Sequence, residues 1–438
     1  MLNLRYLFKK ARDSFWFVPT LIIVMSILSA MFLLYIDKTH PFTPEGIFKI
    51  IFSENSDSGR TVLTVIAGSM VGIAGTVFSI TIVVLQLASS QFGPRLLQNF
   101  MYKRLNQVVL GQYVGVFLYS IIVINAMRDN DDYAFIPNLS ILFALILSVF
   151  NVFLLVIFIH SISMSIQPSK IINELRLRIE DTIQTLYPQQ IDEDLSLFEH
   201  DHSTKKLKKI KNIFSEFSGY IQYFDLDSII QIAQKHDIVI KIRHKPGAYI
   251  VKNQIVFEIF QQEKEKEQTS DLEELSLNTT YQLDKKKTFF QDVEFGIHQI
   301  VEIASKALSP SVNNPYTATN CIDNLTSILC KLTNVKIPDA AIKDEDEILR
   351  VITMKDSFEG YLNAAFNLIR QYGKSSPFII IKLMEALIII SEADRSNAHT
   401  KILKNYAKLV METGDKSFLL QADIDDLEQR YTTFKTGI

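Results

Sequence analysis

Residues 61–94 of the chain read TVLTVIAGSMVGIAGTVFSITIVVLQLASSQFGP, and this stretch decides the architecture of the protein. It contains no Asp, Glu, Lys or Arg. It is also longer than the ~20 residues that an α-helix needs to cross the ~30 Å hydrocarbon core of a bilayer. The stretch therefore predicts a transmembrane helix over about residues 61–88.

One face of this predicted helix is unusually small and polar. Small residues recur along it at steps of four, three and four residues: Gly68, Gly72, Gly75 and Ser79. Hydroxyl and amide groups follow in a second stripe: Thr76, Ser79 and Gln86. Small residues let helix backbones approach closely in a membrane, and oxygens that face a cavity are what a neutral conduction path needs. Two interpretations stay open, a pore wall and plain helix packing with the hydroxyls bonded back to their own backbone.

The predicted helix is followed by a break at Gly93-Pro94, because proline removes a backbone donor and disfavours helix in the residue before it. Arg95 comes next and would stand at the inner mouth of a pore. Arg95 therefore joins the candidate pore or packing residues.

Three further apolar runs predict transmembrane helices at about residues 15–36, 108–127 and 136–166. Basic residues cluster before the first span, between the second and third, and after the fourth. Segments rich in Lys and Arg stay in the cytoplasm. The sequence therefore predicts a multi-pass membrane domain over residues 1–167 with both termini in the cytoplasm.

The composition changes at Pro168 to that of a soluble protein. Residues 168–217 predict a helical stalk, in which the run KKLKKIKN forms a solvated helix face or contacts anionic lipid. Residues 218–290 predict a small β-containing subdomain, because IVIKIR and AYIVKNQIVFEI are apolar at alternate positions and are separated by turns. Residues 291–438 predict a helical subdomain.

The β-containing part resembles half of a barrel-sandwich domain of the biotinyl and lipoyl type. The lysine-bearing turn that receives the cofactor in those domains has no counterpart here, so we expect no cofactor. The predicted fold class is an α-helical membrane protein with four transmembrane helices and a cytoplasmic α+β domain, which combines the small β element with a helical bundle.

A resemblance that covers nearly the whole chain rests on three groups of segments. They are GSMVGIAGTVFSITIVVLQLASSQFGPRLLQNF with NQVVLGQYVGVFLYS, SGYIQYFDLDSIIQIAQKHD with KPGAYIV, and DVEFGIHQIVEIASKALSPSVNNPYTA. Together they resemble a bacterial family of predicted membrane proteins, the domain of unknown function 2254. The resemblance implies four spans and a cytoplasmic domain in the inner membrane of a bacterium, and it implies no established activity.

The loop SPSVNNPYTATN, residues 309–320, is the most site-like part of the soluble region. Asn313 or Asn314 is placed to cap the helix that Pro315 begins. A structural corner between two helices is one interpretation, and a ligand or partner contact through Asn313, Asn314 and Thr317 is the other. Asn314 stands where the family pattern suggests an acidic residue, which argues against a metal in this loop.

The helix before this loop carries Glu294, His298 and Glu302 at steps of four residues. This spacing permits a divalent metal or acid-base chemistry, but a solvated, salt-bridged helix face is the commoner explanation of such a pattern, and we expect no metal there. The sequence shows no phosphate-binding loop with lysine, no nucleophile elbow and no kinase signature. We therefore predict no catalytic residues and no enzyme.

Length and charge narrow the remaining function classes. The chain has 438 residues, 48% of them apolar, and a net charge of −3, which implies no nucleic-acid partner. Membrane lipid and further copies of the chain are the expected partners, and a small ion or a small-molecule ligand stays open. Two functions remain: an oligomeric ion channel or channel-like pore regulated by its cytoplasmic domain, and a membrane-anchored sensor or scaffold without conduction.

Overall fold

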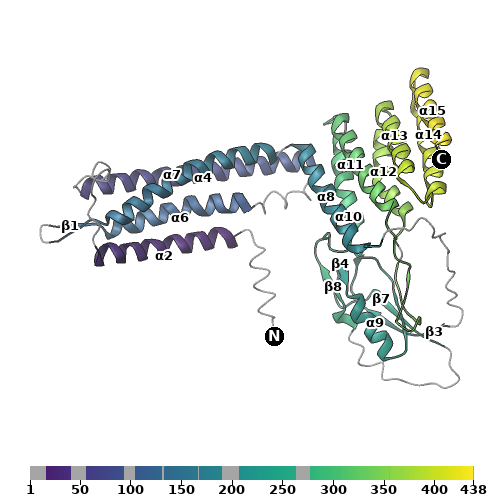
Figure 1. Ribbon diagram of the computed structural model, residues 1–438, viewed down its shortest axis with the longest axis horizontal. Coiled ribbons are helices and arrows are strands. Elements are labelled where there is room, and N and C mark those ends of the chain that lie inside the picture. The colour runs from purple at the N-terminus through teal and green to yellow at the C-terminus, as the bar shows by residue number, and fades with distance from the viewer. Residues whose placement is uncertain are drawn as a thin grey trace. The chain divides into compact units, whose positions relative to one another are not determined.

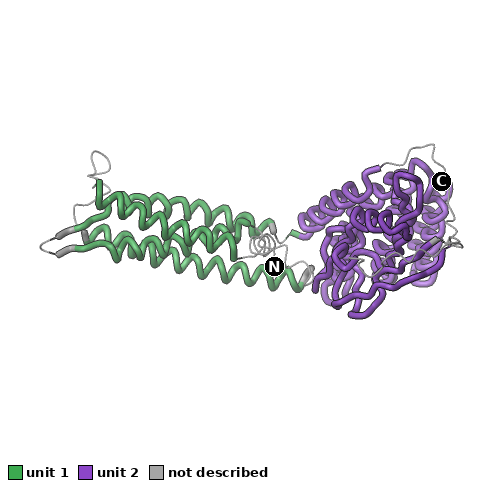
Figure 2. The backbone as a smooth tube through the Cα atoms, turned by 90° about the horizontal axis from the view of Figure 1, so that it is seen from below, with its two compact units in different colours: residues 1–167 green, residues 168–438 purple. Residues whose placement is uncertain are grey.

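The computed structural model of the chain describes residues 16–40, 56–92, 104–130, 133–165, 167–189, 207–262, 277–354 and 356–437. The chain divides into two compact units, residues 1–167 and residues 168–438, which Figure 2 draws in two colours. We call them the N-terminal unit and the C-terminal unit.

The described part of the N-terminal unit contains four long apolar helices: α2 (Phe17–Thr39), α4 (Ser56–Phe92), α6 (Arg104–Ala126) and α7 (Asn138–Ser165). By length and composition each could cross a membrane, as the sequence predicts, although the helix ends differ from the predicted spans by up to several residues. A short antiparallel hairpin, β1 (Arg128–Asn130) and β2 (Tyr133–Phe135), lies between α6 and α7 (Figure 1).

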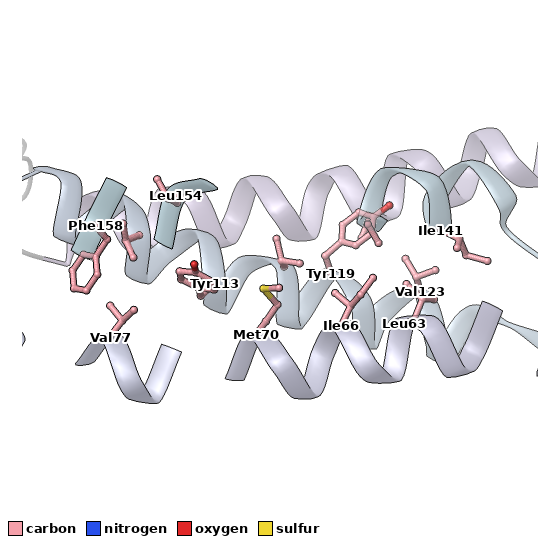
Figure 3. Close-up of a cluster of buried hydrophobic side chains, with 14 of the residues drawn as sticks. Leu63, Ile66, Met70, Val77, Tyr113, Tyr119, Val123, Ile141, Leu154 and Phe158 are labelled. Atoms are coloured by element: carbon pink, nitrogen blue, oxygen red, sulfur yellow. The ribbon is translucent and has the colours of Figure 1, made fainter. Parts of the chain in front are cut away.

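The core of the N-terminal unit is apolar and contains two buried tyrosines. Figure 3 shows α4 contributing Leu63, Ile66, Met70 and Val77 to this core, opposite side chains of α6 and α7. The hydroxyls of the tyrosines donate to backbone carbonyls of α7, from Tyr113 to Asn151 at 2.7 Å and from Tyr119 to Ser140 at 2.9 Å. These hydrogen bonds satisfy the two buried phenol hydroxyls.

Two glycines of α6 allow α2 to pack closely against it. A Cβ at Gly111 would stand 2.8 Å from the Cα of Pro19, and a Cβ at Gly115 would stand 2.5 Å from Oγ of Ser26. The pair has the G-x-x-x-G spacing that lets membrane helices approach backbone to backbone. The small-residue seam inside this unit is therefore on α6, at two glycines that were not among the predicted packing residues.

A buried carboxylate ties the end of α2 to the start of α7. Asp37 accepts hydrogen bonds from the backbone N–H of Leu139 at 3.0 Å and of Ser140 at 2.9 Å, and from the Ser140 hydroxyl at 2.7 Å. These N–H groups have no partner within their own helix at its N-terminus, so a side chain from another helix caps α7. The first predicted span stops at residue 36 and misses this residue.

The C-terminal unit combines helices with two sheets. Its helices are α8 (Pro168–Leu186), α9 (Leu226–Lys235), α10 (Val293–Ala307), α11 (Pro315–Thr333), α12 (Phe358–Gly373), α13 (Pro377–Ala393), α14 (Thr400–Ser417) and α15 (Gln421–Thr436), with the short 3₁₀ helix η3 (Leu277–Thr279). Helices α8, α11 and α12 pack against α10, and α11, α14 and α15 pack against α13. The apolar face of α8 shows why: its buried residues, Ile171, Ile172, Leu175, Ile179 and Ile183, recur with helical period.

The strands form a five-stranded and a three-stranded sheet. The first has the order β3 (Leu207–Phe214), β7 (Ile255–Gln262), β5 (Val239–Ile242), β10 (Leu349–Ile352) and β9 (Ala341–Lys343). The second has the order β6 (Tyr249–Ile250), β4 (Gly219–Phe224) and β8 (Tyr281–Asp284). Strand β10 is parallel to β5, and the other neighbours are antiparallel.

Three features differ from the sequence analysis. The run KKLKKIKN lies largely on β3, where Lys209 forms an ion pair of 2.5 Å with Glu258 of β7, so it is not a helix face of a stalk. The predicted strands do not form one simple hairpin, because β5 pairs with β7 in the first sheet while β6 pairs with β4 in the second. Residues 291–438 are not all helical, because β9 and β10 complete the first sheet. Strands of three and four residues are too short to show a period of two in the sequence.

Candidate functional site

The small-residue face of α4 points away from the other helices of its unit. Apart from the adjoining residues and backbone of α4 itself, no described atom lies within 4 Å of the position that a Cβ would take at Gly68, Gly72 or Gly75. Ser79 and Gln86 are exposed as well. The opposite face of α4 is the one that enters the core. The structure therefore places the predicted small and polar stripes together on one open face, and no described helix of the chain covers them.

The hydroxyls on this helix largely satisfy themselves. Thr76 donates to the carbonyl of Gly72 at 3.1 Å, Thr81 to that of Val77 at 2.8 Å and Ser90 to that of Leu87 at 2.9 Å. Gln86 differs, because its amide makes no hydrogen bond with any described residue. Residues 93–103 lie outside the described residues, so the predicted role of Arg95 and the break at Gly93-Pro94 stay predictions.

The loop from Ser309 to Asn320 joins α10 to α11, and Asn314 is its cap residue. The Asn314 side chain accepts a hydrogen bond from the backbone N–H of Thr317 at 3.1 Å, and Pro315 opens the helix, as the sequence predicts. Asn313 has φ of 43°, in the left-handed region that asparagine tolerates better than most residues. The local hydrogen bonds give both asparagines a structural role, and a ligand or partner contact stays a prediction.

The face of α10 that carries His298 between two glutamates is a solvent-accessible helix surface. Nε2 of His298 lies 3.7 Å from Oε1 of Glu294, and both side chains are more than 40% exposed. No group of three or more His, Cys, Asp or Glu that could hold a metal ion occurs among the described residues. The geometry is that of a solvated i,i+4 pair.

A cavity of about 180 Å³ in the C-terminal unit is the better-formed site. We call it the Lys245 cavity. Its apolar wall includes Leu186 of α8, Phe224 of β4, Leu226 of α9, Ile242 of β5 and Ile342 of β9. Ligand sites are typically concave and apolar with a few convergent polar groups, and the polar groups here are concentrated around Lys245.

The polar end of the Lys245 cavity is built from segments that are far apart in the sequence. Nζ of Lys245 donates to Oδ1 of Asp356 at 2.7 Å, and the hydroxyl of Tyr187 donates to Oδ2 of the same carboxylate at 3.1 Å. The Tyr187 hydroxyl also lies 2.7 Å from that of Tyr361. Burial raises the pKa of Tyr187 and Tyr361 above the usual value, so both phenols stay protonated at neutral pH.

The turn that carries Lys245 is fixed by Gly247 and Asp292. The turn closes with a hydrogen bond from the N–H of Ala248 to the carbonyl of Lys245 at 3.2 Å. Gly247 has φ of 80° and lies directly against the carboxylate of Asp292, which caps α10 by accepting from the N–H of Phe295 at 2.8 Å. Burial raises the pKa of Asp292 to about 6, although the hydrogen bond from Phe295 opposes the rise.

None of the residues predicted as site residues lies in the Lys245 cavity. The segments KPGAYIV and DVEFG, which carry Lys245, Gly247 and Asp292, were noted only for the resemblance and for turn chemistry. The lysine directly before Pro246-Gly247 was the available signal. Tyr187 and Asp356 carry no local signal, because only the packing of α8 and of the segment before α12 brings them to Lys245.

Comparison with known proteins covers most of the chain. Two proteins are 28% identical to it over 379 residues, which is 86% of this chain and 72% of each relative: "Uncharacterized protein Mb1321c" of Mycobacterium bovis and "Uncharacterized protein Rv1290c" of Mycobacterium tuberculosis. No solved structure matches the chain significantly. The family model described as "Predicted membrane protein (DUF2254)" matches residues 12–388, and the chain therefore belongs to that family.

Proposed function

We propose that the protein assembles in the membrane as a homo-oligomer through the small-residue face of α4, and that the assembly forms a channel-like pore regulated by the C-terminal unit. One observation carries the proposal. Gly68, Gly72 and Gly75 leave open space on the outside of the N-terminal unit, although glycine in a helix interior costs about 1 kcal/mol relative to alanine.

The contrast with α6 supports this assignment. Gly111 and Gly115 are needed inside the chain, because a Cβ there would meet α2. The glycines of α4 have no such partner among the described residues. In a membrane, a small face gains nothing from lipid contact, whereas close backbone packing against another helix stabilises it. Any homo-oligomer of this chain contains a second copy of α4, which can pack against this face. Self-complementary faces are typical of homo-oligomers.

The second stripe is what makes conduction the function we favour. Thr76 and Ser79 turn hydroxyl oxygens to the same open side as Gln86, whose amide has no partner among the described residues. An unsatisfied amide in a hydrocarbon environment costs several kcal/mol. A water-filled path along a symmetry axis would hydrate it, and so would the interface with an adjacent copy.

The alternative is a membrane-anchored sensor or scaffold without conduction. The Lys245 cavity favours it, because a sensor requires a ligand site, and a ligand can be sensed by the C-terminal unit even if the membrane part conducts no ions. Both functions share the membrane location, so flux measurements separate them.

The assembly is tested with Gly72→Leu in purified protein. Leucine has open space in the single chain, so its fold should persist, while assembly through this face should weaken at least tenfold. Val149→Leu is the matched control, since Val149 is exposed on another helix, α7. Subunit number by native mass spectrometry reads the result. An unchanged subunit number in Gly72→Leu would show that another surface assembles the protein.

Conduction is measured as ion flux into liposomes that contain the purified protein. Gln86→Leu, and Ser79→Ala, which keeps the side chain small, should lower the flux tenfold or more without changing the subunit number, because both substitutions remove hydrogen-bonding groups from the path. The same substitutions would leave the flux unaffected if the stripe were only a packing seam. A wild-type protein that assembles but conducts nothing under varied voltage, pH and tension would leave the sensor or scaffold function.

We also propose the inner membrane of a bacterium with both termini in the cytoplasm, from the distribution of basic residues. The test uses a chain in which Cys321 and Cys330, the two native cysteines, are replaced by serine. Asn130→Cys, between α6 and α7, should react with an impermeant thiol reagent added outside intact cells. Leu419→Cys, on the surface of the C-terminal unit, should react only after lysis, and the opposite labelling pattern rules this orientation out.

A further inference from the structure

We propose that the Lys245 cavity binds a small uncharged molecule with a mostly apolar body and one hydroxyl-type group that both donates and accepts a hydrogen bond. This inference concerns the C-terminal unit alone and does not depend on a pore in the membrane part.

The walls of the cavity favour the apolar body. Leucine, isoleucine and phenylalanine side chains from α8, α9, β4, β5 and β9 line much of it, together with Pro246 and Pro338 from the connecting segments. Its volume is about 180 Å³, and an apolar cavity of roughly 150 Å³ in another protein is known to bind benzene. A molecule somewhat larger than benzene, such as a substituted phenol, therefore fits.

The charges at the polar end favour an uncharged ligand. The ammonium of Lys245 is neutralised by Asp356, at 2.7 Å, and both side chains are about one-third exposed. His244 is held in place by a 3.0 Å contact between Nε2 and the carbonyl of Ile255, so Nε2 donates. Asp339 stands on the exposed rim. Asp356 and Asp339 would repel an anionic ligand, and Lys245 would repel a cationic ligand. Either would have to disrupt the ion pair to bind.

The same ion pair suits a hydroxyl. Lys245 has three N–H donors and spends one on Asp356, and the carboxylate retains acceptor positions beside those that Lys245 and Tyr187 occupy. A ligand hydroxyl at this place can accept from the ammonium and donate to the carboxylate at once. Charge-assisted hydrogen bonds of this kind are stronger than those between neutral groups.

The polar end is also held rigidly before a ligand arrives. Tyr187 is fixed by Asp356 and Tyr361, and the turn of Lys245 is fixed by the contact between Gly247 and Asp292. A ligand therefore loses little affinity to ordering the protein, which is the usual benefit of a preorganised site.

The test is an NMR titration of p-cresol against the full-length protein in nanodiscs, with empty nanodiscs subtracted. We expect saturable binding with a dissociation constant on the order of 1 mM or tighter, a range suited to a ligand with so few atoms. p-Toluate and 4-methylbenzylammonium share the body of p-cresol and differ in charge. Both should bind at least tenfold more weakly.

Charge variants of the ion pair give the sharpest control. Asp356→Asn leaves Lys245 unpaired, so p-toluate should become the preferred probe by at least tenfold. Lys245→Met leaves the carboxylate unpaired, and 4-methylbenzylammonium should then be preferred. Each change of preference compares probes within one variant, so a modest loss of stability does not affect the result.

Two filling variants locate the binding. Ile342→Trp, on the edge strand β9, and Thr353→Phe, after β10, both place a larger side chain in the cavity. The titration uses whichever variant keeps the wild-type thermal unfolding profile. p-Cresol affinity should fall at least tenfold. Undiminished p-cresol binding in a folded filling variant, preference of the wild-type protein for a charged probe, or absence of saturable p-cresol binding would each overturn the proposal.

Discussion

Gly247→Ala is expected to destabilise the C-terminal unit by roughly 2–5 kcal/mol, enough to unfold a marginally stable domain. Two costs combine. The φ of 80° at Gly247 is a left-handed conformation that L side chains rarely adopt. A Cβ would also clash with Oδ2 of Asp292. The carboxylate cannot simply turn away, because it is buried and its other oxygen caps α10 through the N–H of Phe295.

The measurement is the thermal unfolding of the purified protein followed by circular dichroism. Asn253→Ala is the matched control, because Asn253 also has a positive φ, of 65°, but stands in an exposed turn. It should cost only about 1 kcal/mol, the backbone part alone. Equal losses in the two variants would show that the contact with Asp292 contributes nothing. The double variant Gly247→Ala with Asp292→Ala should lose less than the sum of the single variants, because the clash is then absent.

Gly111→Leu is expected to destabilise the N-terminal unit by about 3 kcal/mol, the upper end for overpacking. The Cβ at this position would stand 2.8 Å from the Cα of Pro19, which is backbone and cannot rotate aside. Helix α2 would have to move away from α6, and Asp37, near the end of α2, would have to leave the N-terminus of α7. The better helix propensity of leucine returns less than about 1 kcal/mol and does not reverse the sign.

Reversible unfolding in mixed detergent micelles measures this loss. Gly72→Leu makes the same chemical change on α4, where nothing lies within 4 Å, so only the gain in helix propensity applies. The monomer should be unchanged or slightly more stable. A loss in Gly72→Leu as large as that in Gly111→Leu would contradict the assignment of the α6 glycines to the internal seam and the α4 glycines to the open face.

The sequence by itself determined the features of the fold that depend only on residues close together in the chain. A run of apolar residues without charges forms a helix that can cross a membrane whatever surrounds it, so the four helices of the N-terminal unit follow from composition. The change of composition at Pro168 is visible in the same way. The cap at Asn314 also follows, because a cap joins groups only three residues apart.

Only the tertiary structure decided which glycines pack inside the chain. Both α4 and α6 carry small residues at helical spacing, and the spacing does not show which face meets a neighbour. The structure gives the internal seam to Gly111 and Gly115 and leaves Gly72 open. The reason is geometric: the closeness of two helices depends on where the second helix lies, which no local pattern encodes.

The five-stranded sheet and the Lys245 cavity could not be predicted from the sequence, for the same reason. Strand β10 joins β5 across more than one hundred residues, and its four residues have no period of their own to report. Lys245, Tyr187 and Asp356 become one polar site only when α8, the turn before β6 and the segment before α12 pack together. A hydrogen bond between distant segments depends on the folded positions of both, so the sequence supplies the groups and the tertiary packing makes the site.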